Sequence, residues 1–305
     1  MTNATPRLTV GITTRNRPAS LQRCVESLRH IAHLSPEILV FDDASEVPAS
    51  TVLTPHPGLR VIRDDRGPGN IVGRNMLMRE ASADAVLLLD DDAALLEGTG
   101  VDRALAILAQ DRNVAAVAFA QANDDGRPWP ESMQPARGQS ARYVAAFIGF
   151  AHLLRRDIFQ RLGGYRERFV FYGEEKDYCL RLLDHEHAVV YLPDALVMHA
   201  QDASGRTPQR YLRYVTRNDC LNALYNEPFR RVVWLLPARV ALYFRMRQRW
   251  KVNDPAGLRW VLKEVVTNAG AAWRERKPVS RRTHERWRRL RDTNLPYQPP
   301  AEQQP

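Results

Sequence analysis

"VLLLDDDA", residues 86–93, joins four apolar residues to three adjacent carboxylates, Asp90, Asp91 and Asp92. A short apolar run of this kind is typical of a strand buried in a parallel sheet. Three neighbouring carboxylates repel one another and resist burial. We therefore expect either solvated turn residues at this strand end or a site where a cation offsets the repulsion.

The same pattern recurs along the first hundred residues. Three further runs read as strands, and two of these also end in paired acids: residues 8–14, 37–43 and 59–65. Between the first two, Leu21, Val25, Leu28 and Ile31 recur at helical spacing. This alternation predicts an α/β fold with a mostly parallel sheet flanked by helices, in which ligands bind beyond the carboxyl ends of the strands. Later strands are expected at 114–120 and 142–154, and helices at 101–110 and 175–187.

The composition limits the class of protein. With 305 residues and 44% hydrophobic content, the chain can form one large domain and an appendage. Its three cysteines, Cys24, Cys179 and Cys220, have neither disulfide-framework nor zinc-site spacing, which favours a reducing, cytoplasmic compartment. We expect no signal peptide and no membrane-spanning helix, because no apolar run is long enough.

Positive charge is concentrated near the C-terminus. Residues 226–305 contain 18 Lys and Arg against 7 Asp and Glu, and five of the six tryptophans, whereas residues 1–225 contain 26 against 28. We therefore expect a catalytic domain at 1–225, with a donor half at about 7–120 and an acceptor half at about 121–225. A helical basic appendage is expected at 226–292, and a disordered Pro/Gln-rich tail at 293–305.

Four segments in order, "VGITTRNRP", "VFDDAS", "GPGNIVGRNMLM" and "LLLDDDA", resemble glycosyltransferase family 2, the inverting nucleotide-sugar transferases of GT-A fold. The resemblance implies that Asp43 contacts the nucleobase, that Asp90 lies near the ribose and the metal, and that Asp92 is a metal ligand. The expected donor-binding residues are Thr13, Arg15, Asp43, Arg74, Asn75, Asp90 and Asp91. Asp42 could equally be a turn residue, and Arg74 could belong to an ordinary surface pair.

A second segment, "GGYRERFVFYGEEKDYCLRL" at 163–182, resembles the family's acceptor-side pattern and implies that Glu175 is the general base. The acceptor hydroxyl must lose a proton as it attacks, and neighbouring acids such as Glu174 and Asp177 can raise the pKa of a carboxylate that accepts it. The alternative is that these acids only favour the first turn of a helix.

Four more residues are candidates. His199 stands where many family members carry a metal-binding His, so the expected metal ligands are Asp92, His199 and Asp90, and the expected cofactor is Mn²⁺ or Mg²⁺. Gly149, Phe150 and Trp129 are expected on the acceptor side, although Trp129 could be local packing. Arg217 and Asn218 resemble a motif of the bacterial rhamnosyltransferase-like branch.

The segment 229–251 mixes aromatic, aliphatic and arginine residues and is too short to span a bilayer. It could lie on an anionic membrane at the inner face, or pack on the catalytic domain or on a second subunit as a homodimer. No recognised module accompanies the charge, so we expect no specific nucleic acid partner.

These observations favour an inverting, metal-dependent glycosyltransferase that moves a sugar from a UDP-, dTDP- or GDP-sugar to a hydroxyl of a glycan, lipid-linked or natural-product acceptor. A sugar nucleotidyltransferase is one alternative, but "VGITTRNRP" lacks the Gly-rich basic signature expected of its first loop. A non-catalytic basic binding protein, with purely structural acids, is another.

Overall fold

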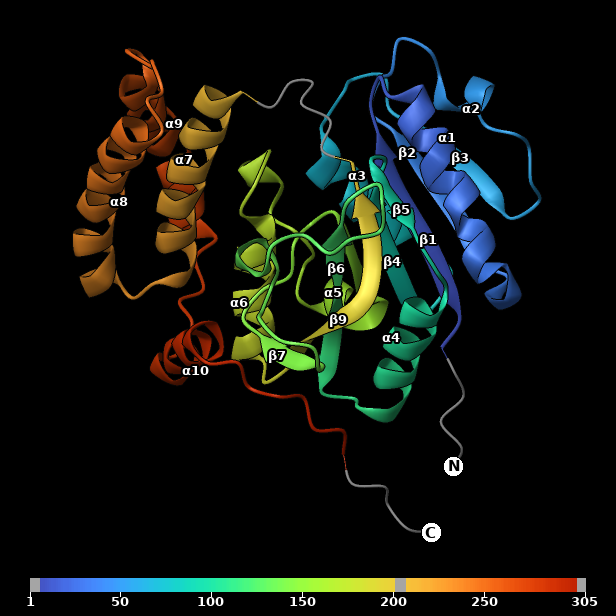
Figure 1. Cartoon of the computed structure of the whole chain (residues 1–305). Coiled ribbons are helices and arrows are strands. Elements are labelled where there is room, and N and C mark those ends of the chain that lie inside the picture. Colours follow the sequence, from blue (N-terminus) through green and yellow to red (C-terminus); the bar gives the residue numbers. More distant parts are fainter. Residues whose placement is uncertain (1–5, 201–206, 301–305) are drawn as a thin grey trace.

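The computed structural model describes residues 6–200 and 207–300. Within them, nine strands form one mixed sheet in the order β3-β2-β1-β4-β8-β6-β9-β5, and β7 also pairs with β9 (Figure 1). The strands are β1 Leu8–Thr14, β2 Glu37–Asp42, β3 Leu59–Arg63, β4 Ala85–Asp90, β5 Ala93–Leu95, β6 Val114–Ala122, β7 Arg142–Val144, β8 Ala151–Arg155 and β9 Ala188–His199.

The strands predicted from the first hundred residues are the parallel part of this sheet. β3, β2, β1 and β4 all run in the same direction. Their register places Thr13 opposite Phe41 on one side and opposite Asp90 on the other. The acids that follow β2 and β4 therefore meet at one edge, as the sequence predicts.

The single strand expected at 142–154 is wrong, because the segment forms two strands. β7 pairs antiparallel with β9, whereas β8 pairs antiparallel with both β4 and β6. The chain must leave the sheet to change neighbours, and it does so at residues 145–150. The amide of Asp90 donates to the carbonyl of Phe150 at 2.8 Å, which holds this connection against the end of β4.

Helices cover both faces of the sheet. Alternate residues of the strands pack with α1 (Pro18–Ser27) and α4 (Thr99–Gln110) on one face, and with α3 (Asn70–Glu80), α5 (Arg156–Arg161) and α6 (Glu174–Asp184) on the other. Short helical segments occur at Ala49–Val52 (α2) and, in 3₁₀ form, at Leu28–Leu34, Glu131–Met133 and Glu167–Phe169. This two-faced burial explains why the strands are almost uninterrupted apolar runs.

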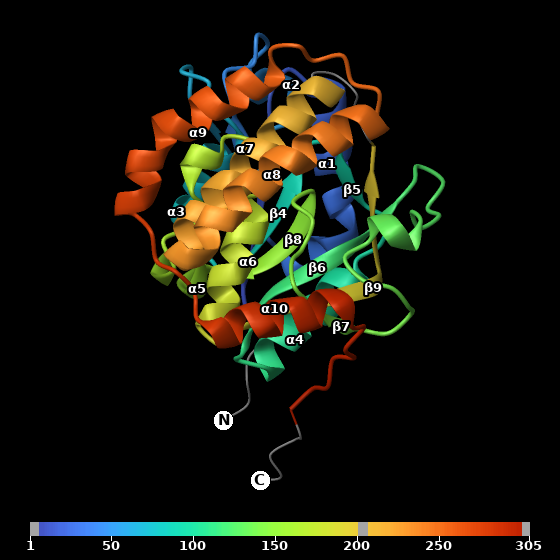
Figure 2. The same cartoon turned by 90° about the vertical axis from the view of Figure 1, so that its left-hand side faces the viewer.

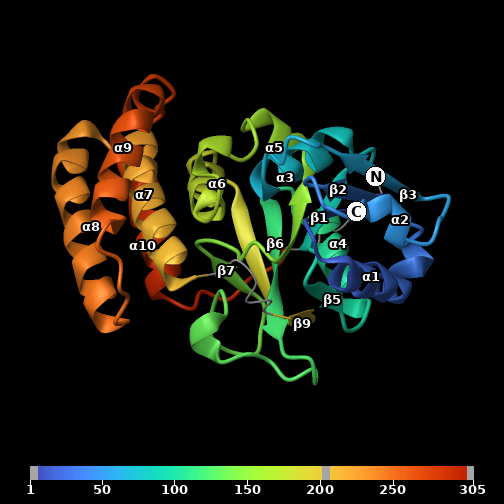
Figure 3. The ribbon, with the colours of Figure 1, turned by 90° about the horizontal axis from the view of Figure 1, so that it is seen from above.

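The C-terminal helices form a bundle beside the sheet. α7 (Pro208–Asn226), α8 (Phe229–Arg249) and α9 (Gly257–Arg274) share a small core of Leu212, Tyr243, Val252 and Val261, and α8 is the outermost element in Figures 1 and 3. α7 also joins the bundle to the domain, because Leu221, Leu224 and Tyr225 pack into the core beneath α6. The last helix, α10 (Arg281–Asp292), returns to the main domain and packs on α6 and β7.

The tail at 293–305 was expected to be disordered, and this is wrong for its first half. The amide of Tyr143 donates to the carbonyl of Leu295, and the amide of Tyr297 donates to the carbonyl of Ala141, each at 2.9 Å. The ring of Tyr297 packs edge-on against Tyr143, with 5.3 Å between centroids. The segment pairs with the exposed edge of β7, an option that its Pro/Gln-rich composition does not reveal. Residues 301–305 lie outside the described structure.

Candidate active site

A cavity of about 710 Å³ lies beyond the carboxyl ends of β1, β2 and β4. Its walls come from these strand ends, from the start of α3, from the 145–150 connection and from the turn before α6. A larger cavity, about 880 Å³, lies on the other side of the Gly163–Glu167 segment and contains neither Glu175 nor any of the three acids after β4. The smaller cavity is therefore the candidate site.

Asp43 organises one end of this cavity. It is buried, it accepts a hydrogen bond from the amide of Gly69 at 2.8 Å, and its other oxygen lies 3.4 Å from Arg15 Nη1. Gly69 has φ of +97°, a conformation that favours glycine and leads directly into α3. Asp42, by contrast, is a turn residue, because Ser45, Ala49 and Arg63 satisfy its carboxylate.

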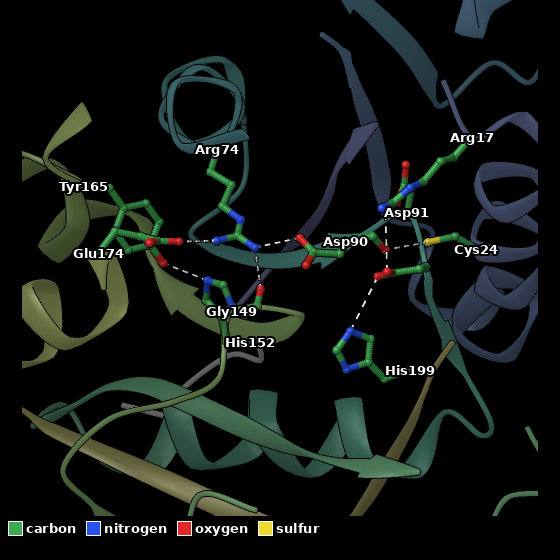
Figure 4. Close-up of polar contacts among 11 residues, drawn as sticks. Arg17, Cys24, Arg74, Asp90, Asp91, Gly149, His152, Tyr165, Glu174 and His199 are labelled. Atoms are coloured by element: carbon green, nitrogen blue, oxygen red, sulfur yellow. Dashed lines mark hydrogen bonds and ion pairs between the residues drawn. The ribbon is translucent and has the colours of Figure 1, made fainter. Parts of the chain in front are cut away.

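Two arginines neutralise the three carboxylates at the end of β4, Asp90, Asp91 and Asp92. Arg74 Nη2 lies 2.6 Å from Asp90 (Figure 4), and Arg17 Nη1 lies 3.1 Å from Asp91 and 3.4 Å from Asp92. Thr14 Oγ1 also donates to Asp91 at 2.8 Å. Burial nevertheless raises the pKa of Asp91, and Arg17 opposes that effect. The repulsion between these acids is thus offset by the protein's own cations.

Asp92 and His199 meet because β5, which follows Asp92, pairs antiparallel with the end of β9. Gln121 donates its amide N–H to the carbonyl of Met133, so the oxygen of the same amide accepts from His199 Nδ1 at 2.8 Å. In the neutral ring, Nε2 therefore carries the lone pair, and it faces a carboxylate oxygen of Asp92 at 3.7 Å.

Asp92 and His199 fit a divalent cation as two of its ligands, so they form only part of a complete site. Two acceptors 3.7 Å apart are within the span of ligands that each lie about 2.1 Å from one ion. In the described part of the chain, no group of three or more His, Cys, Asp or Glu is arranged to hold a metal. Asp90, expected as the third ligand, pairs with Arg74 instead. Magnesium sites commonly combine one or two carboxylates with substrate phosphates, which would supply the other ligands.

Glu174 and Glu175 begin α6 and face the acids after β4 across the cavity. Arg74 lies between them: its Nη1 is 2.8 Å from Glu174, and its Nη2 donates to Asp90 and to the carbonyl of Gly149. Glu174 is 2% exposed, whereas Glu175 is partly open to the cavity. A Cβ on Gly149 would overlap Glu175 Oε1, so only glycine permits this approach.

Burial governs the protonation of both carboxylates. It raises the pKa of Glu174 to about 8, with Glu175 as the second cause, and these effects outweigh the attraction of Arg74. Burial also raises the pKa of Glu175, against the same arginine. The pair therefore retains a proton at a pH where an ordinary carboxylate has lost it, which is the property required of a general base that works near neutrality.

Besides Asp92, three predicted site residues lie outside the cavity wall. Asn75 holds the backbone of Tyr165 and the carboxylate of Glu167. Asp177 is fully buried between Arg166 and Arg181, so it is an internal ion-pair partner, not an acceptor-side group. Trp129 stacks on the ring of His199, as does Phe150. The remaining predicted residues line the cavity, apart from Asp92 beside His199: Thr13, Arg15, Asp43, Arg74, Asp90, Asp91, Gly149, Phe150, Glu174, Glu175 and His199.

A turn before α6 depends on two residues of α7 whose role sequence reasoning did not predict. Val170, Tyr172 and Gly173 all have positive φ, which is costly for the first two. Asn218 Nδ2 donates to three carbonyls, those of Phe169, Phe171 and Tyr172, at 2.9, 2.7 and 2.6 Å. Arg217 donates to the carbonyls of Arg168 and Phe169 and to Asn218. The only sequence signal was the Arg-Asn dipeptide itself.

The mixed sheet, with its cavity beyond the parallel strands, defines the GT-A class of fold. The solved structure of Staphylococcus aureus TarS residues 1–349 with UDP-GlcNAc superposes with a TM-score of 0.58 at 14% identity, over 88% of this chain and 90% of that one. The mannosyltransferase PcManGT of Pyrobaculum calidifontis, solved with GDP-Man and Mn²⁺, gives 0.53 at 16%, over 93% and 84%. These likenesses concern the fold.

The family model described as Glycosyl transferase family 2 matches residues 9–167, more than half of the chain. The chain belongs to this family and is a glycosyltransferase. It is 26% identical over 208 residues to YwdF, an uncharacterized glycosyltransferase of Bacillus subtilis, which covers 65% of this chain and 76% of the relative. It is also 31% identical over 123 residues to the N-acetylglucosaminyl-diphospho-decaprenol L-rhamnosyltransferase of Mycobacterium tuberculosis, covering 38% of this chain and 39% of the relative.

Proposed function

We propose that this glycosyltransferase transfers a sugar, with inversion and with the help of a divalent cation, from a nucleotide diphosphate to an acceptor hydroxyl. The observation that carries the proposal is a single cavity with Asp43 and Gly69 at one end, the acids after β4 along its wall and the partly open carboxylate of Glu175 facing them. The solved structures that contain UDP-GlcNAc and GDP-Man support a nucleotide-sugar donor.

Glu175 is the proposed base. It takes the proton of the acceptor hydroxyl while the hydroxyl oxygen forms a bond to the anomeric carbon, and the bond from that carbon to the diphosphate breaks on the opposite face. Glu174, held by Arg74, stays in place as the neighbour that helps keep the pKa of the pair high. Arg17 and Arg74 supply positive charge beside the position proposed for the leaving diphosphate.

Asp92 and His199 are the proposed cation ligands, with Asp90 nearby. The cation would neutralise charge on the departing diphosphate, as Mg²⁺ and Mn²⁺ do with phosphates generally. Stacking of Trp129 and Phe150 on the His199 ring would keep the imidazole in one orientation. Mn²⁺ in the PcManGT structure supports the use of a divalent cation.

The nucleotide part of a UDP-, dTDP- or GDP-sugar would bind on the donor side of the cavity, to Thr13, Arg15, Asp43, Asp90 and Asp91. The acceptor hydroxyl would lie next to Gly149 and Phe150. Asn75 acts in this scheme only by supporting the Tyr165 segment. We place the enzyme in the cytoplasm.

A donor panel tests the proposal. Purified protein is incubated with UDP-, dTDP- and GDP-sugars and Mn²⁺ or Mg²⁺, slow donor hydrolysis is measured, and binding is followed by calorimetry. At least one donor should bind and turn over, and NMR of the released or transferred sugar should show an inverted anomeric centre. Binding to none of the panel would overturn the proposal, and nucleotide transfer to a sugar phosphate would favour a nucleotidyltransferase.

A further inference from the structure

The exposed apolar side chains of the described residues concentrate on the C-terminal bundle. Twelve large apolar side chains are exposed, and eight of them lie on α8, its C-terminal cap or α9: Phe229, Val233, Trp234, Phe244, Trp250, Leu262, Val266 and Trp273. Trp234 is 78% exposed and Val266 is 74% exposed. Such a concentration marks an interaction surface, whereas single exposed apolar residues are ordinary.

The two helices contribute to one surface. Phe229, at the start of α8, packs edge-on against Trp273, near the end of α9, with 5.7 Å between ring centroids. Leu262, Val266 and Trp273 recur at helical spacing along α9, so they lie on one side of that helix. Figure 2 shows α8 and α9 together in front of the main domain.

Positive charge predominates on these two helices, although Arg231 pairs with Glu227 and Arg239 pairs with Asp219. α8 contains six arginines and no acidic residue, and α9 adds Arg259, Lys263 and Arg274. The one acidic residue of α9, Glu264, pairs with Arg217 on α7. A second copy of the chain would place one cationic helix against another, at a cost in repulsion, whereas an anionic lipid surface offers the opposite charge.

We propose that α8 and α9 form a membrane-docking face that lies on an anionic lipid surface, with Trp234, Phe229 and Val266 in the interfacial region and the arginines at the headgroups. Amphipathic helices with aromatic apolar sides and basic polar sides bind membranes in this way. None of the described helices is long and apolar enough to cross a bilayer.

The docking face would also bring a lipid-borne acceptor to the cavity. Trp250, at the C-terminal end of α8, contacts Tyr211 of α7, and Tyr211 contacts Tyr172 in the cavity wall, with ring centroids 5.7 and 4.9 Å apart. This aromatic series connects the docking face with the proposed acceptor side. The delivery of an acceptor to the cavity rests on the proposed function. Donor turnover in solution tests that function without any membrane, so the two proposals can fail separately.

Vesicle co-sedimentation of the full chain tests the docking face. We expect binding to vesicles of phosphatidylcholine and phosphatidylglycerol, much weaker binding to phosphatidylcholine alone, and loss of binding as salt is raised. The double variant Trp234→Ser with Val266→Ser should bind about tenfold more weakly, since two exposed side chains lose their transfer into the interface. The control, Val47→Ser, removes an exposed apolar residue elsewhere and should bind like the parent.

Three results would overturn the proposal. One is an absence of binding to the anionic vesicles. Another is a control variant that binds as weakly as the docking-face variant. The third is a dimer in lipid-free solution, seen by light scattering, that the docking-face variant converts to a monomer, because a second copy would then cover this surface. Donor hydrolysis should be equal in all the variants without vesicles.

Discussion

The guanidinium of Arg74 lies 2.8 Å from the carboxylate of Glu174. The same guanidinium contacts Asp90 and the carbonyl of Gly149, so one buried cation joins β4, the 145–150 connection and α6. Glu174 is engaged by this contact, and Glu175 is left as the partly open carboxylate on the cavity side. This difference between two adjacent residues is the basis for assigning the base.

Turnover should rise with pH through the neutral range. A proton on the carboxylate pair blocks the base, and burial raises the pKa values of both Glu174 and Glu175 above their ordinary 4.5. A pH profile of kcat/KM for the free enzyme should therefore show an ascending limb well above pH 4.5. A profile that is flat from pH 5 to pH 8 would contradict raised pKa values.

Stability should change with pH in the opposite direction. Because the pKa of Glu174 is about 8 in the fold and 4.5 when unfolded, the native state binds an extra proton between these values. The free energy of unfolding should then fall as pH rises from 5 to 8, by at most about 1.4 kcal/mol per pH unit for this one group. Urea unfolding of Glu174→Gln should show a shallower fall, whereas the exposed control Glu186→Gln should keep the parent slope.

Gly149→Ala should lower activity with little effect on donor affinity. The added Cβ would overlap Glu175 Oε1 and lie 3.0 Å from Arg74 Nη1, so the base must move. A displacement of about 1 Å in a reacting group can cost about a hundredfold in rate. Gly270→Ala is the control, because nothing lies within 4 Å of a Cβ at that position in α9. Unchanged turnover in Gly149→Ala would show that the close approach of Glu175 to Gly149 is not needed for activity.

Asn218→Ala should loosen the turn that precedes α6. Three backbone carbonyls lose a buried donor, which should cost about 1–3 kcal/mol in the free energy of unfolding. If Asn218 positions the catalytic carboxylates, kcat should fall at a temperature where the variant remains folded, while donor affinity by calorimetry stays near the parent value. Asn268→Ala, which removes a local contact within α9, should leave both quantities unchanged. An equal loss of donor affinity would contradict the positioning role.

Much of the fold could be predicted because it depends on local patterns. Apolar runs that end in acids located β2, β3 and β4, and the parallel register then brought Thr13 of β1 beside Asp90. Pairings between distant segments could not be predicted. Arg17 reaches Asp91 and Asp92 only because β1 and β4 are neighbours, and the edge of β7 accepts residues 294–297 only because it is unpaired on that side.

Two of the site residues outside the cavity wall have a related cause. Asn75 and Asp177 lie on the same helices as Arg74 and Glu175, and a one-residue or two-residue step turns a side chain toward another side of the helix. Sequence proximity to a motif therefore did not decide which side chains line the site.

Removal of divalent cations should abolish turnover. EDTA-treated protein should regain activity with Mn²⁺ or Mg²⁺, because Asp92 and His199 provide two ligands and the donor diphosphate the others. His199→Ala and Asp92→Asn should also bind Mn²⁺ more weakly in the presence of nucleotide diphosphate, as measured by electron paramagnetic resonance. His33→Ala, whose ring is exposed, should not. Full turnover in EDTA would show that Arg17 and Arg74 suffice without a metal.

The most direct test of the central claim is a comparison of Glu175→Gln with the parent on the donor and acceptor that the panel identifies. The amide keeps the size of the side chain but cannot take a proton, so kcat should fall by about 10²–10⁴. The donor dissociation constant should stay within about twofold, and Glu186→Gln should behave like the parent. Transfer by Glu175→Gln at the parent rate, with the same donor affinity, would contradict the claim that Glu175 is the base.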